Sequence, residues 1–251
     1  MIYVFDGSYP GLLCSVFETF EMREWDAVPV AQQHFQQDIF TPFRTIDSID
    51  EKAERIGKAI KTKFGPAFSN EVYRAYLSED PFAWQCIHYL IVQKFKGRDI
   101  LNDYGDNKVL YFHQTLKKVS RERHRMKAFI RFQKSSDELY VAVMEPDFNV
   151  LPLILAFFKN RYSDQRWLIY DLKRDYGALY NKTTIEEVIL SKSEQRDLNP
   201  SEVALALDPK EVLYQSLWKS YFKSTNIEAR RNMKLHLQHV PKRYWKYLTE
   251  K

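Results

Sequence analysis

Residues 128–143 read AFIRFQKSSDELYVAV, and this stretch decides how the fold is interpreted. Two apolar runs rich in β-branched and aromatic residues, 128–132 and 139–143, flank a polar segment that is typical of a turn. Upstream of this stretch, apolar residues recur at helical spacing, so the period changes after Lys127. The stretch therefore predicts a β-hairpin that begins a sheet, with Arg131 inside its first strand.

Further strands are predicted after the hairpin. Three apolar runs extend the sheet to about four or five strands, and they lie at 167–170, 177–180 and 187–190. Residues 150–159 are apolar on nearly every side, which predicts a short buried helix. Helices return from Pro209, which suits a first helical turn, to about His239. Because strands and helices do not alternate regularly, we expect an antiparallel sheet.

The N-terminal half is predicted to be mostly helical, after a first strand at residues 1–7. Its helices are expected at 11–24, from Ser48 or Asp50 to Gly65-Pro66, from Ser69, from Asp80-Pro81, and from Asn107 to Arg125. The stretch 25–48 is expected to hold a short strand and loops. This order of helices, sheet and helices predicts the α+β class. Since no linker is visible, we expect one α+β domain over 1–251, within which residues 49–125 could form a helical subdomain.

The composition is that of a globular protein, with 45% hydrophobic and 15% aromatic residues in a chain of 251. This aromatic content excludes a disordered chain. No apolar run approaches the roughly 20 residues of a membrane-spanning helix, and residues 1–7 lack the basic start of a signal peptide. Cys14 and Cys86 lie in apolar surroundings without metal or redox spacing. We therefore expect a cytoplasmic protein that does not bind membranes.

Basic residues gather in two segments, 117–134 and 219–251, while the rest of the chain is net acidic. Nucleic-acid-binding proteins show such asymmetry, although two solvent-exposed helix faces would give the same pattern. The first segment predicts a cationic ridge on a helix, made of Lys117, Lys118, Arg121 and Arg125. Glu122 and His124 are the acid–base pair nearest to this ridge. Alternatively, the cations only complement the negative end of the helix.

Charged residues also follow the predicted strands. Asp147 comes after the strand at 139–143, and Asp171 comes after the one at 167–170. With Arg131 and Arg161 they could form a charged site or a carboxylate pair for a metal ion. Arg131, Arg161, Lys173 and Arg174 are also candidates for contact with nucleic acid. A structural Arg–Asp network is the favoured alternative, because buried charges need partners. The candidate catalytic residues are thus Glu122, His124, Asp147 and Asp171.

The segment 241–248, PKRYWKYL, interleaves cations with aromatic rings. Lys242 and Arg243 could follow the backbone of a single nucleic-acid strand while the rings stack on its bases. A C-terminal helix that docks its aromatic residues on the core would have the same sequence, and docking is the favoured interpretation for Trp245. Both interpretations stay open at the level of sequence.

Nucleotide- and metal-binding motifs are absent from the sequence. It contains neither a phosphate-binding loop nor a dinucleotide fingerprint. Two cysteines cannot hold an iron–sulfur cluster, and His236 and His239 lack a second pair of zinc ligands. No cofactor and no metal ion are expected.

Four parts of the chain resemble the bacterial family labelled "probable DNA metabolism protein", a domain of unknown function. They are FDGS at 5–8 with LCSVFE at 13–18, VSRERHRM at 119–126 with FIRF at 129–132, residues 145–174 starting with EPDFNVL, and LWKSYF at 217–222 with PKRYWKYL at 241–248. The resemblance implies a role in DNA repair or nucleic-acid metabolism. The implied partner is a radical SAM (S-adenosylmethionine) DNA-repair protein, which is usually encoded beside members of the family.

The resemblance carries over no catalytic residue. Related proteins are fused to a uracil-DNA glycosylase-like domain, but the signatures of that enzyme are absent here. Phe157 stands where the resemblance leads us to expect a histidine. We therefore expect, first, a DNA-binding accessory protein that acts with the radical SAM enzyme. The alternatives are an assembly subunit of that enzyme without its own DNA site, and an enzyme that processes a nucleotide or base with His124 and the strand-end carboxylates.

Overall fold

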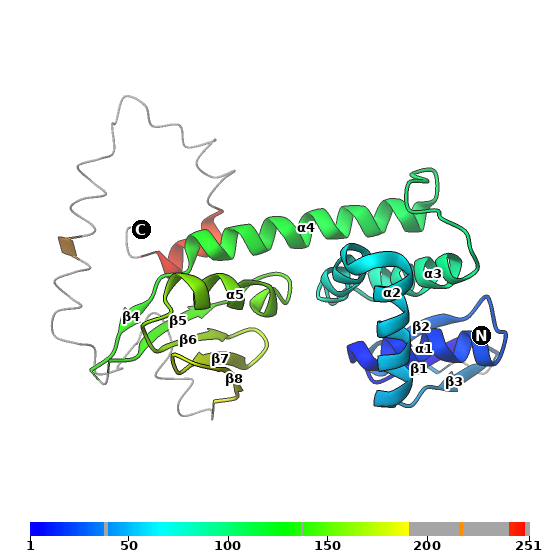
Figure 1. Cartoon of the computed structure of the whole chain (residues 1–251), viewed down its shortest axis with the longest axis horizontal. Helices are drawn as coiled ribbons and strands as arrows, with labels where there is room; N and C mark the ends of the chain where they lie inside the picture. The colour runs from blue at the N-terminus through cyan, green and yellow to red at the C-terminus, as the bar shows by residue number, and fades with distance from the viewer. Residues whose placement is uncertain (38–39, 137, 191–215, 218–240, 249–251) are drawn as a thin grey trace. The chain divides into compact units, whose positions relative to one another are not determined.

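The computed structural model describes residues 1–37, 40–136, 138–190, 216–217 and 241–248 (Figure 1). They combine helices and strands, which confirms the α+β class. The chain divides into two compact units, Met1–Arg121 (unit 1) and Glu122–Lys251 (unit 2), and each is described by itself. The sequence predicts one domain over residues 1–251. That the two units form one domain stays a prediction. Most of the helical region predicted between Pro209 and His239 lies outside the described residues.

Unit 1 begins with a strand, a helix and a strand, in the order that the sequence predicts, but the parallel sheet that these strands form was not predicted. Strand β1 (Ile2–Phe5), helix α1 (Tyr9–Glu21) and strand β2 (Val28–Ala31) are followed by strand β3 (Phe43–Thr45). The strands form a parallel sheet of order β2-β1-β3. The short strand and loops expected at 25–48 are present, but this stretch also holds a second strand, β3. It was missed because strands of three or four residues are too short to show a sequence period.

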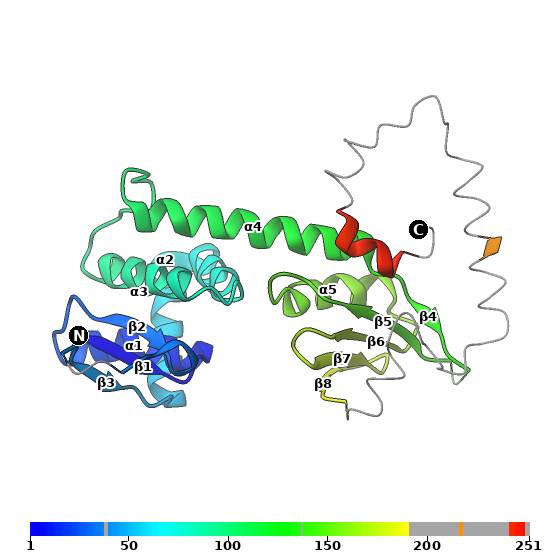
Figure 2. The same ribbon diagram turned by 180° about the vertical axis from the view of Figure 1, so that it is seen from behind.

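Three longer helices complete unit 1 (Figure 2). Helix α2 (Asp50–Tyr76) is bent at Gly65, whose φ of 87° favours glycine. It resumes at Pro66 instead of Ser69, because proline suits a first helical turn. Helix α3 (Pro81–Phe95) is capped as predicted by Asp80, which accepts a hydrogen bond from the backbone N–H of Phe82. Helix α4 (Asn107–Phe129) begins in this unit.

Unit 2 contains a five-stranded sheet of order β4-β5-β6-β7-β8. Its strands are β4 (Gln133–Lys134), β5 (Tyr140–Met144), β6 (Trp167–Asp171), β7 (Tyr176–Tyr180) and β8 (Ile185–Val188). The prediction of a purely antiparallel sheet was wrong, because β5 and β6 are parallel. Helix α5 (Leu151–Arg161) connects these two strands and packs against β7, and such a crossover makes the strands that it joins parallel (Figure 1).

The predicted hairpin is displaced along the chain. Residues 128 and 129 belong to the last turn of α4, and only β4 pairs with β5 in the antiparallel sense. Arg131 therefore lies in the connection after α4 and not in a strand. The Phe129 ring packs against the ring of Tyr244, with centroids 5.4 Å apart. Residues 128 and 129 are thus helical although their local sequence favours a strand, and a contact with a distant residue accompanies this difference.

Helix α5 is only partly buried, contrary to expectation. Leu151, Ile154 and Phe158 face the core of unit 2, whereas Phe157 and Arg161 are exposed.

Among the described residues, no helix has the length and apolar character that crossing a membrane requires. Cys14 and Cys86 are buried and free, which agrees with their apolar surroundings in the sequence.

Candidate functional site

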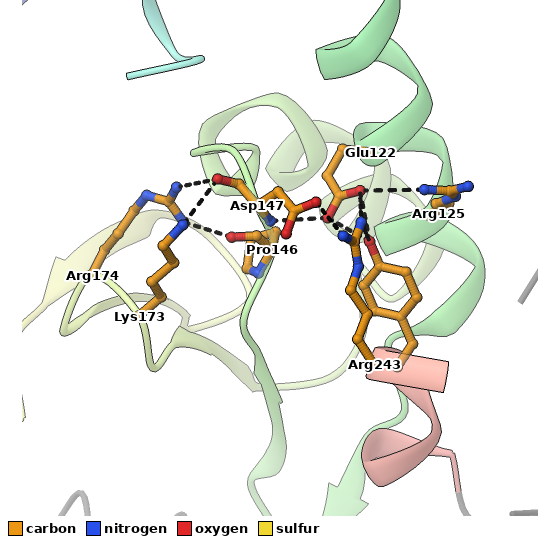
Figure 3. A network of polar contacts seen from close by, with 8 residues as sticks. Glu122, Arg125, Pro146, Asp147, Lys173, Arg174 and Arg243 are labelled. Carbon is orange, nitrogen blue, oxygen red and sulfur yellow. Dashed lines mark hydrogen bonds and ion pairs between the residues drawn. The ribbon is translucent and has the colours of Figure 1, made fainter. Parts of the chain in front are cut away.

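A network of charged side chains joins four segments of unit 2 (Figure 3). Its centre is the loop between β5 and α5, which carries Asp147. Helix α4 contributes Glu122, and the turn between β6 and β7 contributes Lys173 and Arg174. The fourth segment is the short 3₁₀ helix η3 (Lys242–Tyr247). The network therefore gathers candidate residues that lie far apart in the sequence.

Glu122 is the buried anchor of this network, since only 2% of its side chain is exposed. The Tyr244 hydroxyl lies 2.6 Å from both of its carboxylate oxygens, and the backbone N–H of Asp147 donates at 3.0 Å. Arg243 donates to the same carboxylate at 3.0 Å. Burial raises the pKa of the Tyr244 hydroxyl, and the hydrogen bond to Glu122 raises it further. Glu122 is therefore a buried side chain of α4 that holds η3 in place.

Arg125 and Arg243 are the two guanidinium groups beside Glu122. Arg125 lies 3.9 Å from its carboxylate, one helical turn along α4. Arg243 also forms an ion pair with the Asp147 carboxylate, so it connects two acids. Asp147 is 49% exposed, whereas Glu122 is not accessible. Asp147 is thus the only acid of this group that a ligand could reach.

Asp171 forms the other end of the network. Its side chain is fully buried and accepts hydrogen bonds from Arg174 Nη1 at 2.9 Å and the Lys173 backbone N–H at 3.0 Å. Burial raises the pKa of Asp171, although the charge of Arg174 opposes this effect. Arg174 and the Lys173 ammonium also donate to the backbone carbonyl of Asp147, at 3.2 and 3.1 Å. These contacts tie the β6–β7 turn to the β5–α5 loop.

The chemistry available to this network is limited by burial. Three of the four predicted catalytic candidates belong to it, whereas the exposed His124 is not among the residues that contact it. Glu122 and Asp171 are buried, and protein donors already contact both oxygens of each carboxylate. Across the described part of the chain, no group of three or more His, Cys, Asp or Glu side chains could hold a metal ion. The arrangement is suited to holding loops in place, and its contacts are those of the structural alternative.

The other predicted cations are distributed over several places. Lys117, Lys118 and Arg121 are exposed on the part of α4 that belongs to unit 1. Arg131 donates to the Ala128 carbonyl at 2.7 Å, which closes the end of α4. Arg161 lies beside Tyr162, and Lys242 is exposed on η3. The ridge predicted from the sequence therefore has one paired member, Arg125, and three that point to solvent.

Sequence reasoning did not connect Glu122 with Tyr244 and Arg243. More than 100 positions separate them, and no local pattern relates such residues. It expected Arg131 and Arg161 as partners for the strand-end acids, whereas the structure uses Arg174 and Arg243. It also missed the exposed Phe157 on α5, because a helix that is apolar on nearly every side gives no sign of its solvent face.

A family model describes the larger part of this chain. The model for the domain of unknown function DUF4130 matches residues 81–250, about two thirds of the chain. The chain belongs to this family. The DUF4130 region starts at α3, so it covers the end of unit 1 together with all of the network. The chain matches no curated protein and no solved structure significantly.

Proposed function

We propose that this DUF4130 protein binds nucleic acid as an accessory component of DNA repair or DNA metabolism. The supporting observation is the group formed by Lys117, Lys118 and Arg121, which we name the α4 cations. All three are exposed, and none forms an ion pair with another residue in the described part of the chain. Exposed cations without carboxylate partners suit contact with phosphates.

Helix geometry distinguishes this interpretation from the simpler one. Residues 117, 118 and 121 lie within about one turn and a half, so their side chains occupy neighbouring positions on the helix surface. Charge–dipole interactions act over only the last turn of a helix. Since α4 ends at Phe129, the α4 cations lie too far from its end to be explained by that effect. They are available to a polyanion.

The accessory role rests on the resemblance of residues 119–132 and 145–174 to DNA metabolism proteins. In our proposal the partner is a radical SAM DNA-repair enzyme, and this chain supplies nucleic-acid contact and no catalysis of its own. Burial of Glu122 and Asp171 makes the enzyme alternative less favourable. Reconstitution of the two proteins tests the partnership: a stable complex on gel filtration is expected, and separate elution would contradict it.

The DNA contact is tested by fluorescence anisotropy with labelled oligonucleotides over a series of salt concentrations. K117E/K118E/R121E is expected to weaken binding by about 100-fold or more and to flatten the dependence on salt. K58E/K61E/K63E, which reverses three exposed lysines of α2, is the matched control with the same change in net charge. Equal losses in both variants would mean that only net charge matters. Unchanged binding in the first variant would exclude the α4 cations.

A further inference from the structure

We propose that the exposed face of α5 stacks unpaired bases of a polynucleotide, so that this protein prefers single strands to duplexes. This inference rests on the proposed nucleic-acid binding and specifies which form is bound. The evidence for it is a set of contacts within unit 2, and none of these contacts involves the α4 cations.

Phe157 provides the stacking surface. The side chain is 36% exposed, although it belongs to a helix whose other face is buried in the core. Its ring meets the ring of Phe158 edge to face, with centroids 5.1 Å apart, and Phe158 stacks on Tyr162 at 6.2 Å. Phe157 is thus the outer member of a packed aromatic cluster. A ring held in this way loses little freedom when a base stacks on it.

Cations lie beside the outer rings of this cluster. The Lys127 ammonium is 4.9 Å from the centre of the Phe157 ring, and the Arg161 guanidinium carbon is 5.6 Å from that of Tyr162. Neither side chain forms an ion pair with another described residue. Proteins that bind single strands combine aromatic stacking surfaces with cations that contact the backbone. The two cations are therefore placed to contact phosphates next to a stacked base.

The form of the nucleic acid follows from the same chemistry. In a duplex the faces of the bases are already covered by their neighbours, whereas unpaired bases offer a free π-face. The tail at 241–248, which the sequence analysis considered for stacking, places Tyr244 and Leu248 in the core instead. In the described part of unit 2, α5 is the element that combines an exposed phenyl ring with neighbouring cations.

The experiment compares Phe157→Ala with Phe82→Ala, a matched change at an α3 ring that is 40% exposed in unit 1. Anisotropy is measured with oligothymidylate, oligouridylate and duplex DNA, each of about 20 units, after circular dichroism shows that each variant is folded. Phe157→Ala should weaken binding of the single strands by about tenfold and leave duplex binding unchanged, while Phe157→Trp keeps the affinity. Loss with only one of the two single strands would assign that polymer as the ligand.

Two results would overturn the inference and separate it from the proposed function. If Phe157→Ala leaves single-strand affinity unchanged, or if Phe82→Ala lowers it equally, stacking on α5 is wrong. Should K117E/K118E/R121E still abolish binding in that case, nucleic-acid binding itself stands. If the unaltered protein binds neither single strands nor duplex, both proposals are wrong.

Discussion

The network around Glu122 and the α4 cations use the same types of residue for different purposes. In the network, Arg174 and Arg243 are matched by carboxylates that are 0% and 2% exposed, so their charges hold loops and η3 in place. On α4, Lys117, Lys118 and Arg121 have no such partner among the described residues. A count of basic residues cannot distinguish these cases. What decides the role of a cation is whether the fold buries an acid beside it.

The largest expected effect comes from breaking the closed network at its anchor. Glu122→Ala leaves Arg243 and the Tyr244 hydroxyl without their buried acceptor. We expect unfolding free energy to fall by about 3–5 kcal/mol, because the buried Tyr244 hydroxyl and the Asp147 backbone N–H each lose their acceptor, at about 1–3 kcal/mol for each group, and Arg243 loses one of its two acids. Urea unfolding measures this loss. K117E/K118E/R121E serves as the control and should keep the midpoint of the unaltered protein, because its side chains face solvent. A similar loss in both variants would remove the distinction between the two groups.

The next effect concerns His88, a buried titratable group that forms no ion pair with any residue that the structure describes. Burial lowers the pKa of His88 from the ordinary 6.5 to about 4, and its ring lies 2.8 Å from the Thr19 hydroxyl. Between these two pH values the unfolded chain binds the additional proton, so this contribution to stability is complete above pH 6.5 and is lost as the pH falls towards 4. The loss should reach about 3 kcal/mol.

Urea unfolding of His88→Gln between pH 7 and pH 4 tests this assignment. The variant should lose less stability on acidification than the unaltered protein does, whatever its stability at pH 7. An identical pH dependence would show that other groups cause the loss.

The smallest effect should come from an ion pair that is exposed on both sides. Lys58 and Glu54 lie 2.6 Å apart on α2, closer than Arg243 and Glu122 at 3.0 Å, but their side chains are 76% and 66% exposed. Lys58→Ala is expected to leave the urea midpoint unchanged, because water solvates both charges after the pair is lost. A clear shift would mean that distance matters more than burial in this protein.

Much of the helical structure could be predicted from local sequence. The cap at Asp80, the break at Gly65 and the spacing of apolar residues in α4 are local properties, and the structure confirms them. The strand predicted at 167–170 from its continuous apolar run is confirmed as β6, which extends one residue further, to Asp171. Errors occurred where two segments had to be combined, as in the parallel pairing of β5 with β6.

The sequence by itself determined the α+β class, most helices and the segments in which charge accumulates. It also contained the candidates Glu122, Asp147 and Asp171, each recognised from its neighbours in the chain. Only the tertiary structure decided that these acids are held by Arg174, Arg243 and Tyr244. It also decided that the side chains of the α4 cations and of Phe157 are exposed to solvent. The physical reason is that periodicity and capping act over a few residues, whereas burial depends on segments that meet only after folding.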